Sequence, residues 1–161
     1  MALLSQKITP FLWFDNNAEQ AVNFYVSTFR DSRILHLQRH AEGGPGPVGS
    51  LFVARFEIEG QPFSALNGGP AFNFTEAVSF VVGCDSQIEV DHLWDRLGEG
   101  GSPGRCGWLK DRFGLSWWQI VPSEFFDLIR DPDPAASARV VAAMMQMTKF
   151  DIAALRSAHR G

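Results

Sequence analysis

Two histidines, His36 and His40, lie four residues apart in a segment of alternating apolar residues, and such a pair could bind a metal ion. If the segment is a strand, both side chains point to the same face, because strand side chains alternate. A metal site would also need an Asp, Glu or Cys at a matching spacing, and none is placed there. We therefore interpret both histidines as half-exposed strand residues.

A second candidate for chemistry is Asp111, which forms a D-x-x-G sequence with Gly114. Its carboxylate could act as a general base, but in such a turn it commonly accepts backbone N–H groups and fixes the turn. We favour the turn. Glu57 and Glu59 alternate with apolar residues, which indicates the solvent face of a strand. No pair of carboxylates therefore indicates acid–base catalysis.

The aromatic residues carry more information, because 5 tryptophans in 161 residues exceed what a core of this size needs. A tryptophan offers an apolar ring and one N–H donor, which suits a pocket for a flat or apolar small molecule. The strand aromatics that we expect around one cleft are Phe11, Trp13, Phe63, Phe80, Trp108 and Trp117.

Two adjacent tryptophans, Trp117 and Trp118, lie in the sequence LSWWQIV, which is typical of a strand. Neighbours in a strand face opposite sides, so both rings cannot enter one core. One ring is predicted to face the cleft, and the other to face the helix layer or a dimer partner.

Composition excludes several classes of protein. The chain has 14 Lys and Arg against 18 Asp and Glu, a net charge of −4, and no basic cluster, so nucleic acid is not expected as a partner. No apolar run reaches a membrane-spanning length, and the N-terminus lacks a signal-peptide pattern, so we expect a cytoplasmic protein with no membrane partner. Cys84 and Cys106 are interpreted as small buried residues or bystander thiols.

The first half of the chain, about residues 7–67, predicts a strand, a helix and three further strands. Asp15, Asn16 and Asn17 offer an N-cap for the helix. The expected segments are a strand at 7–14, a helix after 17, a strand at 33–40, a Gly/Pro-rich loop at 41–50 and a hairpin at 51–67.

The second half begins in the same order but is expected to be shorter by one strand. Its helix should be capped by Asp85 or Ser86. The expected segments are a strand at 77–83, a helix at 85–101, strands at 105–111 and 115–121, and helices at 123–129 and 133–150.

These patterns predict one domain, 1–161, with module one at about 7–67, module two at about 76–121 and a C-terminal helical segment at 123–161. No G-x-G-x-x-G follows the first strand, which is a poor fit to a nucleotide-binding doubly wound sheet. We expect an α+β fold whose antiparallel-rich sheets curl around a cavity.

Several strings resemble the PhnB-like branch of the vicinal oxygen chelate (glyoxalase/bleomycin-resistance/dioxygenase) superfamily, a branch often labelled a demethylubiquinone methyltransferase domain. They are ITPFLWFDNNAEQAVNFY, ALNGGPAFNFTEAVSFVV, RCGWLKDRFGLSWWQIVP and DPDPAASARVVAAMMQMTKFDIAAL. The resemblance implies paired βαβββ modules with mixed, curled sheets that form a cleft, commonly completed in a homodimer. It also implies a divalent metal that polarises vicinal oxygens of a substrate.

The positions that match the superfamily's metal ligands hold poor ligands in this sequence. They fall at Pro10, at Leu66 or Asn67, near Ala77, and at Trp118 or Gln119. Neutral amides are weak ligands for a transition metal, so we predict no metal and no cofactor, with Asn67 and Gln119 added to the ligand-contacting residues. The chain has one more residue than the branch pattern before Gln119, which predicts a bulge near residues 116–118.

We therefore predict a homodimeric protein that binds a small organic molecule in an aromatic cleft. The alternative is a metal-assisted lyase, isomerase or dioxygenase with a non-standard site at Asn67, Asp111 and Gln119. A methyltransferase, as the family label suggests, and a purely structural dimeric interaction module are less favoured. The methyltransferase lacks support because LNGGP lies at a hairpin end and not at a strand-to-helix turn.

Overall fold

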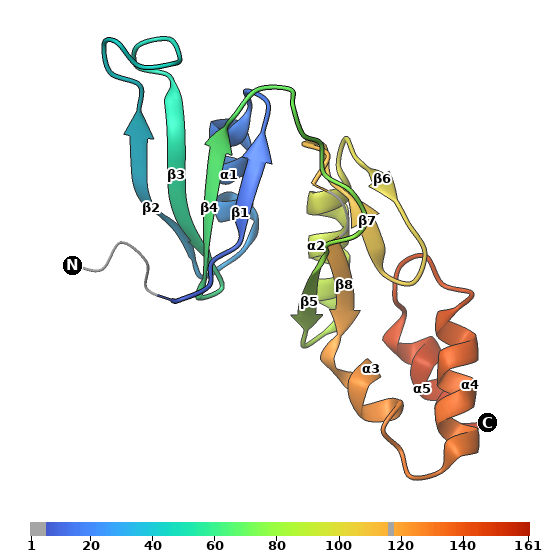
Figure 1. Cartoon of the computed structure of the whole chain (residues 1–161). Helices are drawn as coiled ribbons and strands as arrows, with labels where there is room; N and C mark the ends of the chain where they lie inside the picture. The colour runs from blue at the N-terminus through green and yellow to red at the C-terminus, as the bar shows by residue number, and fades with distance from the viewer. Residues whose placement is uncertain (1–5, 116–117) are drawn as a thin grey trace. The chain divides into compact units, whose positions relative to one another are not determined.

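A computed structural model describes residues 6–115 and 118–161 of the chain. It divides into two compact units, one up to Phe74 and the other from Thr75. Each unit contains a four-stranded mixed sheet with a helix on one face, as Figure 1 shows for α1 and α2. This is the α+β arrangement of βαβββ modules that the sequence predicts, and the fold class is confirmed.

The first unit contains β1 (Phe11–Phe14), α1 (Ala18–Thr28), β2 (Ser32–Arg39), β3 (Leu51–Ile58) and β4 (Gln61–Asn67). The strand order in the sheet is β1-β4-β3-β2, with β1 parallel to β4 and the other pairs antiparallel. Glu59 and Gly60 have positive φ angles and join β3 to β4 in a two-residue turn, which is the geometry that fits the twist of a hairpin. The turn fixes the register of β3 against β4.

The second unit contains β5 (Phe80–Cys84), α2 (Gln87–Gly98), β6 (Ser102–Pro103), β7 (Trp108–Lys110) and β8 (Trp118–Pro122). Its sheet has the order β5-β8-β7-β6, with β5 parallel to β8, so it repeats the topology of the first. The prediction that this half lacks one strand is wrong. The strand that was missed, β6, has two residues, one of them proline, which is too short for a periodic signal.

Each helix covers its sheet with an apolar stripe at helical spacing. In α1 the buried residues are Ala18, Ala21, Val22, Tyr25 and Thr28, and in α2 they are Val90, Leu93 and Leu97. The predicted cap of α2 is confirmed at Ser86, whose hydroxyl accepts a hydrogen bond from the N–H of Glu89 at 3.2 Å. No helix in residues 6–115 and 118–161 is both long and apolar enough to cross a membrane.

Three helices follow β8 in the second unit: α3 (Ser123–Leu128), α4 (Pro134–Met144) and α5 (Ile152–Arg160). The helix expected over 133–150 is shorter than predicted because backbone turns at 143–147 end it. The segment after α4 is tied to the sheet, since Cys106 N–H donates to Met147 and Gly107 N–H donates to Thr148 at 2.9 and 2.8 Å.

Side chains also join this C-terminal segment to α2. The Gln87 amide donates to the carbonyl of Phe150 at 3.0 Å and accepts from the N–H of Ile152 at 2.9 Å. Phe150 is buried, and its ring packs 5.2 Å from that of Phe125. The C-terminal helices therefore share the core of the second unit.

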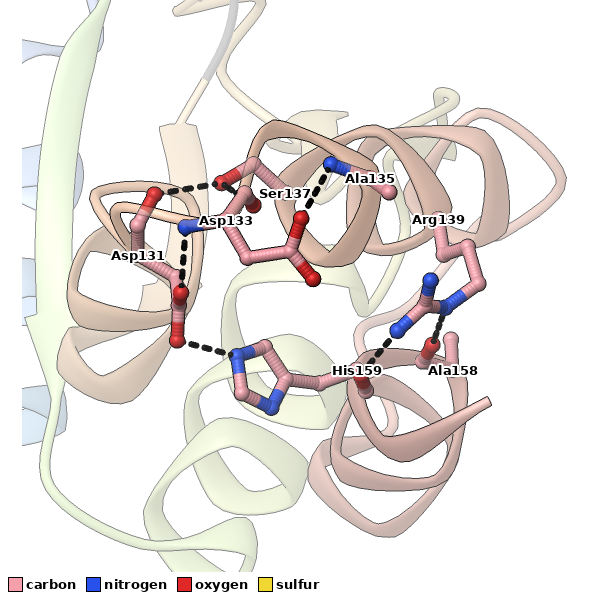
Figure 2. Close-up of polar contacts among 7 residues, drawn as sticks. All are labelled: Asp131, Asp133, Ala135, Ser137, Arg139, Ala158 and His159. Carbon is pink, nitrogen blue, oxygen red and sulfur yellow. Dashed lines mark hydrogen bonds and ion pairs between the residues drawn. The ribbon is translucent and has the colours of Figure 1, made fainter.

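Polar contacts hold α5 against α4 and against the turn before it, as Figure 2 shows. The Asp131 carboxylate lies 2.9 Å from Nε2 of His159, and the Arg139 guanidinium donates to the carbonyls of Ala158 and His159 at 2.9 and 2.7 Å. Asp133 caps α4 by accepting from the N–H of Ala135. The end of the chain is thus part of a defined helical layer.

Candidate functional site

The face of the first sheet opposite α1 carries side chains that could contact a ligand. Strand pairing places four of them side by side: His36 pairs with Arg55, Arg55 with Ser64, and Ser64 with Phe11. We call these four residues the Arg55 row. The alternate positions face the helix, since Ala54, Phe56 and Ala65 are fully buried and Asn67 contacts the start of α1.

Phe11, at the end of this row, is an exposed aromatic side chain on a strand at the edge of its sheet. It is 57% exposed, whereas its neighbours Leu12 and Phe14 are buried on the side of α1. A large apolar side chain left open on a sheet face is a candidate contact for a ligand or a partner.

Trp13 lies on the same face, one pair along from Phe11, and is held in place by the loop after β4. Its indole N–H donates to the carbonyl of Gly69 at 2.9 Å, and its ring meets Phe72 edge-on with centroids 5.0 Å apart. A Cβ atom at Gly68 would lie 2.3 Å from the indole, so only glycine allows this approach. Trp13 thus provides a fixed, half-buried aromatic surface.

Arg55 and Ser64 were missed in the sequence, although they occupy the middle of the row. Ser64 is 3% exposed and Arg55 is half-buried. Within residues 6–115 and 118–161, the Arg55 guanidinium has no ion pair or hydrogen bond, and the Ser64 hydroxyl has no hydrogen-bond partner. The hairpin register could have indicated this pair, because a two-residue turn at Glu59 and Gly60 places residue 55 opposite residue 64.

Asn67, which was predicted to contact ligand, uses both ends of its amide inside the first unit. Its Oδ1 accepts from the N–H of Ala18 at 2.9 Å, and its Nδ2 donates to the carbonyl of Leu51 at 3.1 Å. Asn17, at the N-cap position, makes no cap hydrogen bond with its side chain. Asn67 therefore caps α1 from a distance of 49 residues along the chain.

In the second unit, the face opposite α2 carries two predicted site residues. Gln119 pairs with Val81 on one side and with Trp108 on the other, and both Gln119 and Trp108 are half-buried. The Gln119 amide donates to the hydroxyl of Ser79 at 2.7 Å. Val81 is 55% exposed, so this face too presents apolar surface.

Two other aromatics lie on the side of α2. Phe80 pairs with Trp118, and their ring centroids are 5.6 Å apart. Trp118 is buried, and it pairs with Leu109, which is close to α2 at Gly98. Trp117 and the bulge predicted near residues 116–118 lie outside the described residues, and the role of Phe80 in ligand contact stays a prediction.

Asp111 is buried and forms the D-x-x-G turn. One carboxylate oxygen accepts from the N–H groups of Phe113 and Leu115 at 2.9 and 3.1 Å, and the other accepts from the indole N–H of Trp118 at 3.0 Å. Both oxygens thus have partners. This is the structural interpretation of Asp111 that the sequence favours over a general base.

The residues present do not fit a divalent metal. No group of three His, Cys, Asp or Glu side chains in the described ranges is placed to hold one. At the positions that correspond to superfamily ligands, the Asn67 amide caps α1 and the Gln119 amide bonds to Ser79. Burial raises the pKa of the Cys84 thiol to about 12, so this side chain offers no thiolate at neutral pH.

The two βαβββ units have the fold that the resemblance to the vicinal oxygen chelate superfamily implies. Residues 6–121 match the model of the family described as 3-demethylubiquinone-9 3-methyltransferase, and the chain belongs to this PhnB-like family. Among curated proteins, none matches the chain closely enough to count as a relative.

Three solved structures illustrate the similarity. The chain is 35% identical to a Bacillus cereus PhnB protein described as a putative 3-demethylubiquinone-9 3-methyltransferase, with a TM-score of 0.68 over 73% of this chain and 100% of that one. Protein PA1353 from Pseudomonas aeruginosa is 22% identical, with a TM-score of 0.60 over 74% and 100% of the two chains. The fosfomycin resistance protein FosX from Mesorhizobium loti shares the fold at 13% identity, with a TM-score of 0.51 over 72% and 90%.

Proposed function

We propose that this protein binds a small organic molecule on the sheet face opposite α1. The observation that carries the proposal is the pair formed by exposed Phe11 and fixed, half-buried Trp13 on one face, beside the largely buried Ser64. An apolar surface with a few polar groups is the usual composition of a ligand site. The face opposite α2, with Trp108 and Gln119, offers a second set of the same kind.

Support for binding over methyl transfer comes from the glycines at the end of β4. A methyl donor that carries a nucleoside is commonly held by a glycine-rich turn between a strand and a helix. Here Gly68 gives room to the Trp13 ring, and Gly69 accepts from its N–H. These glycines position an aromatic side chain, and we do not propose the methyltransferase activity named in the family description.

We also propose that the protein is cytoplasmic and forms a homodimer. The dimer is suggested by β1 and β5, which are edge strands of their own sheets and each carry an exposed apolar residue, Phe11 and Val81. Exposed apolar edges favour association. Light scattering of the purified protein should give twice the chain mass of 17.9 kDa. A monomer at every concentration would exclude the dimer.

The experiment on ligand binding is mass spectrometry of the native protein after gentle purification, followed by extraction of bound small molecules. We expect a co-purified organic compound that is lost when Phe11 and Trp13 are both changed to Ala. The matched control is Ile88→Ala, which removes an exposed apolar side chain from α2 and should leave the compound bound. A compound retained by the double variant would contradict binding at this face.

The second candidate is a metal-assisted enzyme, favoured by the superfamily and not by the donor set of this chain. A metal that binds the native state raises the melting temperature by mass action. We expect no increase with Mn²⁺, Zn²⁺, Ni²⁺ or Fe²⁺. A higher melting temperature with one of these metals would favour the enzyme instead, provided that Gln119→Ala abolishes the rise. Gln38→Ala, at an exposed strand residue, is the control and should keep the rise.

A further inference from the structure

We infer that the ligand of the face opposite α1 is an organic oxyanion, a carboxylate or a phosphonate on an apolar body, which Arg55 and Ser64 bind by its charged group. The inference rests on the proposed function and adds the chemical class of the ligand.

The Arg55 side chain is charged and half-buried. A guanidinium is charged at every physiological pH, and holding it half-buried without a partner costs free energy. Across the part of the chain that the structure describes, Arg55 has no ion pair and no hydrogen bond. By contrast, Arg33 on the same face pairs with Glu57 at 3.0 Å, and Arg39 pairs with Glu19 at 2.6 Å.

The hydroxyl of Ser64 lies beside Arg55 in the sheet. Ser64 pairs directly with Arg55 in the sheet, so the two side chains point to the same face. Ser64 is 3% exposed, and its hydroxyl likewise has no partner in the described ranges. A guanidinium and a hydroxyl side by side are donors that match the two oxygens of a carboxylate, or two of the three of a phosphonate.

Apolar and aromatic side chains surround Arg55 and Ser64 on this face. Phe11 follows Ser64 in the row, and Val53, Leu66 and Trp13 form the next row on the same face. Glu57, two residues after Arg55 on the same face of β3, is already paired with Arg33. The donors are thus bordered by apolar and aromatic side chains, which fits a ligand with an apolar body and one charged end.

The test compares anions with neutral molecules of similar size that carry the same ring. Phenylacetate and phenylphosphonate are titrated against phenylacetamide and benzamide, with intrinsic tryptophan fluorescence and melting temperature as the readouts. We expect the anions to bind wild-type protein about tenfold more tightly than the amides, because a charged hydrogen bond contributes roughly that factor. Arg55→Gln should remove this preference, and Ser64→Ala should reduce it.

The matched control is Arg33→Gln, which removes a guanidinium from the same face that already has a carboxylate partner. It should leave the preference for anions unchanged. The two anions distinguish the carboxylate from the phosphonate, and whichever binds more tightly identifies the group.

Each result separates this inference from the proposed function. Equal binding of anions and amides, or a preference that survives Arg55→Gln, overturns the inference and leaves small-molecule binding in place. Absence of binding by all four probes, with no co-purified compound, overturns the proposed function itself. If Arg55→Gln converts a dimer into a monomer and the anion preference remains, Arg55 serves a second copy of the chain and the inference is wrong.

Discussion

The indole N–H of Trp118 donates to the carboxylate of Asp111 at 3.0 Å, and both residues are buried, so the strand β8 is fixed to the turn that precedes it. The same carboxylate accepts two backbone N–H groups of that turn. A buried anion with this many donors is stabilised in place, and the turn depends on it.

We predict that Asp111→Asn lowers the free energy of unfolding by about 2–3 kcal/mol, because the new amide N–H faces donors that need an acceptor. Trp118→Phe keeps an aromatic ring and loses only the indole donor, so it should cost about 1–2 kcal/mol. Urea denaturation of both single variants and the double variant measures the coupling. Independent, additive losses would contradict a direct bond between the two side chains.

Asn67 is predicted to stabilise the protein through α1. Asn67→Ala removes the acceptor for Ala18 N–H and the donor to Leu51, and we expect a loss of about 1–2 kcal/mol. Asn67→Asp keeps the acceptor and should recover part of that loss. The matched control is Asn17→Ala, at the N-cap position but without a cap bond, which should be close to neutral in thermal denaturation. A reversed order of the two Ala variants would contradict the long-range cap.

Thr9 carries a buried hydroxyl with no hydrogen-bond partner in the described ranges. Valine has nearly the same shape and no hydroxyl, so Thr9→Val should raise the free energy of unfolding by about 1 kcal/mol. Thr28→Val is the control, because the Thr28 hydroxyl donates to the carbonyl of Phe24 at 2.8 Å and its loss should lower stability. A destabilised Thr9→Val protein would mean that the hydroxyl has a partner.

The contact of Asp131 with His159 predicts a dependence of stability on pH. The backbone N–H of Asp133, and then His159, lower the pKa of the Asp131 carboxyl below its ordinary 3.8. A lowered folded-state pKa contributes stability above the ordinary value, and that contribution is lost as the pH falls through the folded value. Asp131→Asn should therefore melt below wild type at pH 7.

This difference should shrink below about pH 4. Melting temperatures of both proteins from pH 7 to pH 3 test the expectation. A gap that stays constant over the whole range would assign the effect of Asp131→Asn to packing and not to charge.

Local signals in the sequence predicted much of the fold. The hairpin over 51–67 and the start of α2 at Asp85 or Ser86 were predicted, because each depends on residues close in the chain. The strand β6 and the separate helix α5 were missed. β6 exists through its pairing with β7 and carries no periodic pattern of its own.

In the candidate site too, only local relationships follow from the sequence. Phe11 and Trp13 are two residues apart in a strand, and strand alternation therefore places them on the same face of the sheet. Other relationships depend on contacts between segments distant in sequence. Examples are the pairing of Phe80 with Trp118 and the capping of α1 by Asn67. The place of Arg55 in the row follows from the hairpin register, but its lack of a partner among the described residues depends on the packing of distant segments.

Gln87 forms hydrogen bonds to the backbone on both sides of Asp151, so α2 and the C-terminal segment are expected to unfold together. The family match ends at residue 121, yet residues beyond it supply backbone bonds to Cys106 and Gly107 and a buried ring at Phe150. The end of the family match at residue 121 is therefore not the end of this packed unit. Amide hydrogen exchange should report residues 122–161 opening together with the sheet of the second unit.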